Sequence, residues 1–162
     1  MRVAQLSDLH FGDAKTLPEV ERCTKAAVDA VIAQGADIAV ISGDSTDHAI
    51  DVHSPSFVAL ARQVRRLTDY CPVLMLQGTF SHEPPGTLDI FRLLGGHYPV
   101  YVADRIGQVA WCGNDGWIAS RSWVFDSIPD NVEILFTCVP TVNKAFVAAA
   151  VGADGCVRTQ AQ

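Results

Sequence analysis

The 162-residue sequence lacks long apolar runs and lacks an excess of basic charge. Its apolar runs, such as residues 38–41, fall far short of the roughly 20 residues that a membrane-spanning helix needs. The chain does not open with a basic segment followed by an apolar one, so we expect no secretory signal. A net charge of −6 argues against broad binding of nucleic acid through phosphate neutralisation. It still allows a phosphate ester held by metal ions, because the metals would supply the positive charge.

Cysteine pairs at disulfide or zinc-binding spacing are missing as well. The five cysteines are an odd number, lie far apart and include no C-x-x-C arrangement: Cys23, Cys71, Cys112, Cys138 and Cys156. Neither a disulfide framework nor a zinc knuckle is therefore implied. Several of them fall inside apolar runs, where a reduced cysteine behaves as a small hydrophobic residue. We expect a reducing, cytoplasmic compartment.

The composition is that of an ordinary globular protein, with 49% hydrophobic and 19% charged residues. The length suffices to bury a single core. No internal repeat and no linker between domains is visible in the sequence. We predict one domain over residues 1–151, followed by a disordered tail over 152–162 that lacks hydrophobic periodicity.

The first ninety residues alternate between strand and helix patterns. Strands are predicted at residues 2–7, 38–41 and 72–76, and the last two are short, continuously apolar runs typical of parallel strands buried on both faces. A helix is predicted from Thr16 to Gly35, where Thr16 and Glu19 have the spacing of a capping box. A second helix is predicted to begin at Ser54, and a short one at Thr87. This order predicts a parallel β-α-β-α-β unit of the α/β class.

The sequence pattern of the remainder of the chain is typical of short strands. Residues 109–112 and 117–119 are predicted to form a hairpin around an Asn/Asp/Gly turn. A further strand is predicted over 132–136, and an alanine-rich helix over 143–151.

Acidic, histidine and hydroxyl residues follow each of the first three predicted strands. They are Asp8 and His10 after the first, Asp44, Asp47 and His48 after the second, and Ser81, His82 and Glu83 after the third. Each cluster alone is better explained as an ordinary surface loop. Because the carboxyl ends of parallel strands meet at one sheet edge, the three clusters together predict a shared site. Carboxylate and imidazole together suit a divalent transition metal such as Mn²⁺, Fe²⁺ or Zn²⁺.

Two of these clusters match sequence motifs of a known family. Asp8-x-His10 and Gly43-Asp44 correspond to the first two motifs, D-x-H and G-D, of the calcineurin-like metallophosphoesterases. The opening ten residues look most like the SbcD-like exonuclease branch, which includes versions encoded by phages. The similarity covers residues 1–90 well and the rest weakly. It implies an αββα sandwich of the metallophosphoesterase type, incomplete in this chain.

The resemblance also implies a chemistry. By analogy, Asp8, His10, Asp44 and Ser81 hold the metal, for which Mn²⁺ is the first expectation. A metal-bound hydroxide would hydrolyse a phosphodiester, with Asp44 between two ions and His82 as general acid. Three further residues would contact the ligands or the substrate, although exposed loop residues would look the same: Asp47, His48 and Glu83.

The sequence departs from the family after residue 78. The third motif, G-N-H-[D/E], is replaced by a version with two inserted residues, in which Ser81 stands in the place of the asparagine. The five histidines end at His97, so the family's later histidine and its final G-H-x-H motif have no counterpart. Thr137 or Cys138 stands where the later histidine belongs, and Cys138 is either a thiolate ligand or a buried, inert thiol. We therefore expect the amino-terminal part of a longer phosphoesterase: a fragment, a frameshift product or a natural short form.

Several functions remain open at this point. The first expectation is a nuclease-type phosphoesterase with weak activity in the isolated chain. The alternative is a catalytically inactive or accessory metal-binding remnant. A Rossmann-type nucleotide binder is disfavoured because residues 8–13 do not form G-x-G-x-x-G. Expected partners are a phosphodiester such as DNA, an SbcC-like ATPase for a full-length form, and a second copy through an incomplete sheet, but no membrane.

Overall fold

The structure is a computed structural model, and it describes residues 1–141. The chain divides into two compact units: the first is Met1–Asp104, and the second begins at Arg105. The helix predicted over 143–151 and the tail predicted over 152–162 lie outside the described residues.

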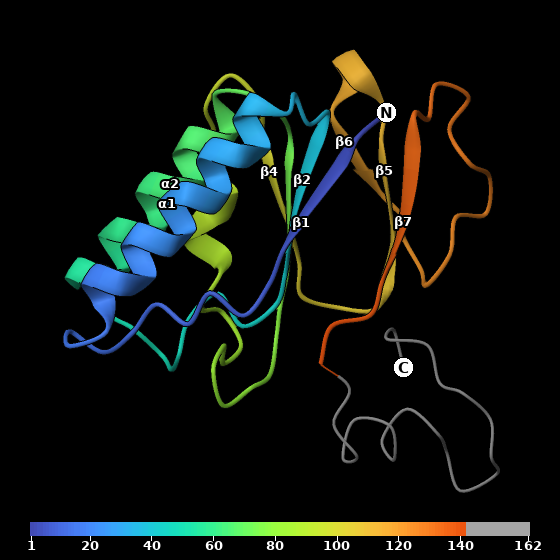
Figure 1. Cartoon of the computed structure of the whole chain (residues 1–162). Coiled ribbons are helices and arrows are strands. Elements are labelled where there is room, and N and C mark those ends of the chain that lie inside the picture. Colours follow the sequence, from blue (N-terminus) through green and yellow to red (C-terminus); the bar gives the residue numbers. More distant parts are fainter. Residues whose placement is uncertain (142–162) are drawn as a thin grey trace, which may run out of the picture. The chain divides into compact units, whose positions relative to one another are not determined.

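The first unit is built on a four-stranded parallel sheet. Its strands stand in the order β1 (Val3–Leu6), β2 (Ile38–Ser42), β3 (Val73–Leu76) and β4 (Val100–Ala103). The long helices α1 (Leu17–Ala33) and α2 (Pro55–Thr68) lie beside each other against one face of this sheet (Figure 1). The predicted α/β class and the parallel β-α-β-α-β unit are both confirmed.

The connection between β3 and β4 differs from the prediction. The short helix expected from Thr87 is a 3₁₀ helix, η1 (Asp89–Leu93), and no side chain caps it. Its backbone bonds join residues three apart, as in Phe91 N–H to the carbonyl of Leu88, which is the tighter helix type used in short pieces. Strand β4 was not predicted, because four residues after Pro99 are too few for a period to stand out.

The two long helices begin differently. Ser54 caps α2 as predicted, since its hydroxyl accepts a hydrogen bond from the N–H of Phe57 at 3.1 Å. The capping box predicted for α1 is wrong. Thr16 has helical backbone angles and makes no side-chain cap, while the carboxylate of Glu19 pairs with Arg22 instead. None of the helices within residues 1–141 is long and apolar enough to cross a membrane.

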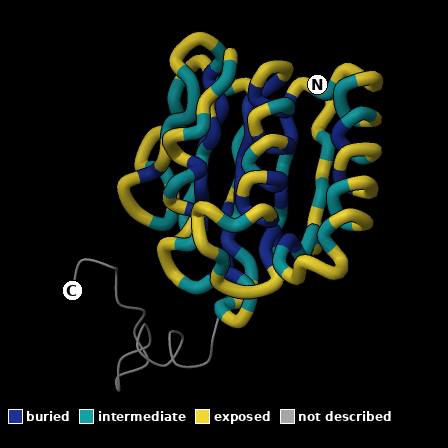
Figure 2. The backbone as a smooth tube through the Cα atoms, turned by 90° about the vertical axis from the view of Figure 1, so that its left-hand side faces the viewer, coloured by how far each residue is buried: buried dark blue, intermediate teal, exposed yellow. Residues whose placement is uncertain are grey.

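The core of the first unit lies between the sheet and the two helices. Strands β2 and β3 are almost wholly buried, whereas both helices keep exposed turns on their outer sides (Figure 2). Phe11 belongs to this core, with 0% of its surface exposed, although it lies in the loop after β1. Removing a buried Phe side chain costs about 3–5 kcal/mol, so Phe11 holds that loop firmly against the core.

The second unit contains a three-stranded antiparallel sheet. Its strands are β5 (Gly107–Trp111), β6 (Trp117–Ala119) and β7 (Ile134–Cys138), in the order β6-β5-β7. A short 3₁₀ helix, η2 (Gly113–Asp115), forms the turn between β5 and β6. The predicted hairpin is confirmed, and the strand predicted over 132–136 is β7, displaced by two residues.

Candidate metal centre

The loops that follow β1 and β2 are joined by backbone hydrogen bonds beyond the ends of the strands. The N–H of Asp8 donates to the carbonyl of Gly43 at 3.2 Å, and the N–H of His10 donates to that of Asp44 at 3.1 Å. An isolated parallel bridge between Phe11 and Thr46 continues the pairing. The first two predicted clusters are thereby brought together at the carboxyl edge of the sheet, as expected.

Backbone strain is concentrated on three of the predicted metal ligands. Within residues 1–141, the non-glycine residues with positive φ are Asp8 (54°), His10 (52°) and Asp44 (51°). This left-handed conformation is uncommon outside glycine and costs about 1–3 kcal/mol for each residue. Such strain persists only where the surroundings impose it, and it clusters at functional sites. The loops therefore hold these three side chains in place at an energetic cost.

Glycines allow the loops after β2 and β3 to approach closely. A Cβ atom added to Gly78 would lie 2.2 Å from both the backbone nitrogen and Oδ1 of Asp44. Gly43, with φ of +96°, would bring a Cβ to 2.9 Å from the Cα of Gly78. No larger residue fits at Gly78 without moving Asp44.

Glu83 ties the same two loops together from inside the protein. Its side chain is fully buried, and its two carboxylate oxygens accept hydrogen bonds from the N–H groups of Ser45 and Gly78. These donors stand next to Asp44 and Thr79 in the chain. Glu83 thus acts on the site by fixing the backbone that carries it.

Asp8, His10 and Asp44 form a group that could hold a cation. One potential ligand atom from each lies within 4.8 Å of the others. His10 Nε2 is 3.9 Å from Asp8 Oδ1, a separation too long for a hydrogen bond. Two ligands at about 2.0–2.2 Å from one ion stand roughly 3–4 Å apart, so an ion fits between these two atoms. Two carboxylates and one imidazole are also a donor set that divalent metals accept.

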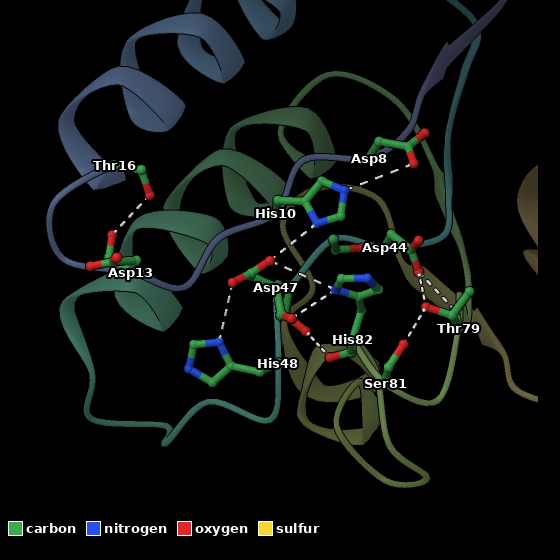
Figure 3. A network of polar contacts seen from close by, with 12 residues as sticks. Asp8, His10, Asp13, Thr16, Asp44, Asp47, His48, Thr79, Ser81 and His82 are labelled. Carbon is green, nitrogen blue, oxygen red and sulfur yellow. Dashed lines mark hydrogen bonds and ion pairs between the residues drawn. The ribbon is translucent and has the colours of Figure 1, made fainter.

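Asp44 is oriented by Thr79, a residue that was not predicted from the sequence. Both the N–H and the hydroxyl of Thr79 donate to Asp44 Oδ1, at 2.7 and 3.0 Å. The Ser81 hydroxyl lies 3.3 Å from that of Thr79, so it connects to Asp44 through Thr79 (Figure 3). A direct metal contact of Ser81 remains a prediction. The sequence signal for Thr79 was a hydroxyl residue directly after Gly78, the glycine that follows the third strand.

His82 lies beside His10, on the side that faces away from Asp8 (Figure 3). The two rings meet edge to face with centroids 4.8 Å apart. His82 Nδ1 is 2.7 Å from the backbone oxygen of Asp47, so Nδ1–H donates and Nε2 is left free to act. The Asp47 carboxylate faces three imidazoles, those of His10, His48 and His82, at 3.5–3.8 Å (Figure 3). The structure therefore places Asp47 centrally, and His48 beyond it.

Cys138 was considered as a thiolate replacement for the family's later histidine. It is buried at the end of β7, and burial raises the pKa of its thiol to about 11. Burial and the raised pKa favour the interpretation of Cys138 as an inert core cysteine.

The fold and this site define a mixed α/β protein with a candidate metal centre at the carboxyl edge of a parallel sheet. No family model matches the chain, and no curated protein matches it. Among solved structures, it is similar to nuclease MPE of Pseudomonas putida, with 23% identity and a TM-score of 0.42. The match covers 64% of this chain and 48% of that one, so the matched part spans less than half of the nuclease.

Proposed function

We propose that the chain is a metal-dependent phosphoesterase of the calcineurin-like family, acting on phosphodiesters in the manner of the SbcD-like nucleases. One observation carries this proposal. The three non-glycine residues held in the left-handed conformation within residues 1–141 are the three ligands expected from the D-x-H and G-D motifs. Backbone strain clusters at functional sites, and here it falls on that particular set.

The residues divide the work between them. Asp8, His10 and Asp44 would hold a divalent cation, which polarises a phosphate ester and activates water when bound. Protonated His82 can give its Nε2 proton to the departing oxygen, since Nδ1 is committed to the backbone of Asp47. Asp47 is thus a positioning residue for His82, and Thr79 is one for Asp44.

The donor set and the net charge restrict the metal and the substrate. Two carboxylates and one imidazole suit Mn²⁺, with Fe²⁺ or Zn²⁺ as alternatives. A chain of net charge −6 needs the cation to approach a phosphodiester such as DNA. An SbcC-like ATPase partner and the reducing, cytoplasmic compartment stay predictions from the sequence.

The proposal is tested by phosphodiester hydrolysis with and without metal. Bis(p-nitrophenyl) phosphate and end-labelled linear DNA should be cleaved in Mn²⁺ and not in EDTA. Asp44→Ala should lower the Mn²⁺-dependent rate by about 100-fold or more, because the cation loses a ligand. Asp126→Ala, which removes an exposed carboxylate of the second unit, is the matched control and should leave the rate unchanged.

A second candidate function is a metal-binding accessory protein without catalysis. It is favoured by the sequence, in which no histidine follows His97, and by the Ser81 hydroxyl, which lies against Thr79. This alternative predicts that Mn²⁺ binds, as seen by loss of the free-ion EPR signal, while hydrolysis stays at the EDTA level.

A further inference from the structure

We propose a second cation site, formed by His10, Asp47 and His82, that overlaps the first and excludes it. The site would take a transition metal of the Zn²⁺ or Co²⁺ type. That one site excludes the other depends on the proposed function, which places the first ion at Asp8, His10 and Asp44. The second site is argued separately, from the geometry of its own three residues.

The three side chains already stand at the spacing of ligands around an ion. One ligand atom from each lies within 4.8 Å of the others. Asp47 Oδ1 is 3.6 Å from His10 Nδ1 and 3.8 Å from His82 Nδ1. Both separations exceed hydrogen-bonding distance and match the roughly 3–4 Å between two ligands of one ion. To bind the ion, His82 Nδ1 would give up its proton and its hydrogen bond to the backbone oxygen of Asp47.

An unsatisfied atom points to the same position. His10 Nδ1 is buried and, among the described residues, is one of the side-chain atoms without a hydrogen-bond partner. Leaving a buried polar atom unpaired costs about 1–3 kcal/mol, and each such atom in a native structure calls for an explanation. An ion between His10 and Asp47 would supply the missing partner.

His10 makes the two sites mutually exclusive. Its Nε2 faces Asp8 and its Nδ1 faces Asp47, so the ring stands between the two groups (Figure 3). A neutral imidazole carries one lone pair, on one nitrogen at a time. His10 can therefore complete one site only by leaving the other.

The two groups differ in the metal that they favour. Two imidazoles and one carboxylate, as at His10, Asp47 and His82, form a common set for Zn²⁺, with a fourth position left open. The first group has two carboxylates and one imidazole, which shifts preference toward Mn²⁺. Zn²⁺ in the new site would also occupy His82, the proposed proton donor, and would therefore oppose Mn²⁺-dependent hydrolysis.

Metal binding to two variants, each with one carboxylate replaced by an uncharged amide, tests the proposal without relying on activity. Asp8→Asn and Asp47→Asn each remove one carboxylate, and Asn tolerates the left-handed backbone at position 8. Asp8→Asn should still bind one Co²⁺ per chain, with the intense visible absorption of a four-coordinate ion. Its Mn²⁺ binding should be at least about 10-fold weaker than that of the wild type. Asp47→Asn should lose the Co²⁺ site and keep Mn²⁺ binding, and His10→Ala should lose both metals. Far-UV circular dichroism establishes that each variant is folded.

Competition in the wild-type chain and in Asp47→Asn tests the exclusion, because Zn²⁺ can also displace Mn²⁺ directly from the first site. Adding Zn²⁺ should release Mn²⁺ from the wild type one for one, and at a lower Zn²⁺ concentration than from Asp47→Asn; the EPR signal of free Mn²⁺ measures the release. Co²⁺ affinity and absorption left unchanged by Asp47→Asn would overturn the site, and so would absence of Co²⁺ binding in folded Asp8→Asn. Mn²⁺ that stays bound at saturating Zn²⁺ would overturn the exclusion. Failure of the proposed function shows up separately, as Mn²⁺ binding without hydrolysis.

Discussion

Three residues of the candidate site adopt a backbone conformation that costs stability. Asp8, His10 and Asp44 each hold a left-handed conformation that costs about 1–3 kcal/mol. Buried contacts from neighbouring residues must offset this cost. The carboxylate of Glu83, fully buried between the loops after β2 and β3, is such a contact.

Glu83→Gln should destabilise the protein through those two hydrogen bonds. The amide nitrogen would face a backbone N–H, so one bond is lost and two donors oppose each other. We expect a loss of about 1.5–3 kcal/mol in the free energy of unfolding, measured by urea denaturation. Glu21→Gln removes a half-exposed ion pair with Arg62 and is the control, with an expected loss below about 1 kcal/mol. Equal effects of the two changes would remove the structural role assigned to Glu83.

The identities of the clustered residues could be predicted from the sequence, but their arrangement could not. Asp8, His10 and Asp44 follow strands whose apolar runs are visible, so their convergence was expected. Nothing in residue type alone distinguishes Asp47, which faces three imidazoles, from an exposed loop aspartate. Its position depends on the Phe11–Thr46 bridge, which is a tertiary contact between loops.

At the scale of elements, the close approach of the loops after β2 and β3 depends on Gly78. Gly78→Ala should lower the free energy of unfolding by more than about 2 kcal/mol, because its Cβ would lie 2.2 Å from Asp44. The same change should weaken Mn²⁺ binding by about 10-fold or more, since Asp44 must move. Gly95→Ala meets nothing nearer than 3.9 Å and should leave Mn²⁺ affinity unchanged. Calorimetric titration with Mn²⁺ measures the affinity of both variants. Wild-type Mn²⁺ affinity in Gly78→Ala would contradict the dependence of Asp44 on Gly78.

The helix starts yield a separate prediction on stability. Ser54→Ala should cost about 1 kcal/mol, because the N–H of Phe57 loses its partner. Thr16→Ala should cost only a few tenths of a kcal/mol, as its hydroxyl merely donates to the exposed carbonyl of Asp13. Thermal unfolding of the two variants side by side measures the difference, and a larger effect at Thr16 would contradict the observed caps.

Elements were predictable where hydrophobic periodicity extends over enough residues. The 17 residues of α1 show a clear apolar stripe, while β4 has four residues and was missed. The capping box at Thr16 was mispredicted because Glu19 has another partner. Arg22, three residues further along the helix, binds the carboxylate of Glu19 through two hydrogen bonds and lowers the pKa of Glu19 to about 2. Glu19 therefore pairs with a side chain of its own helix and does not take part in a capping box.

For the molecule as a whole, metal binding should be linked to folding. A cation bound only by the folded chain raises the free energy of unfolding by about 2.7 kcal/mol when its concentration is 100 times the dissociation constant. Mn²⁺ should therefore raise the melting temperature of the wild-type chain and leave that of Asp44→Asn unchanged. Differential scanning calorimetry in Mn²⁺ and in EDTA measures both, and an equal shift in the variant would show that Mn²⁺ binds elsewhere.

The proposed function requires that Asp8, His10 and Asp44 together hold one divalent cation. Anomalous diffraction at the manganese absorption edge, from crystals of the chain grown in Mn²⁺, would locate that ion. We expect a peak within about 2.0–2.4 Å of a carboxylate oxygen of Asp8, of His10 Nε2 and of a carboxylate oxygen of Asp44. No peak at this edge of the sheet, or a peak that touches none of the three side chains, would contradict it.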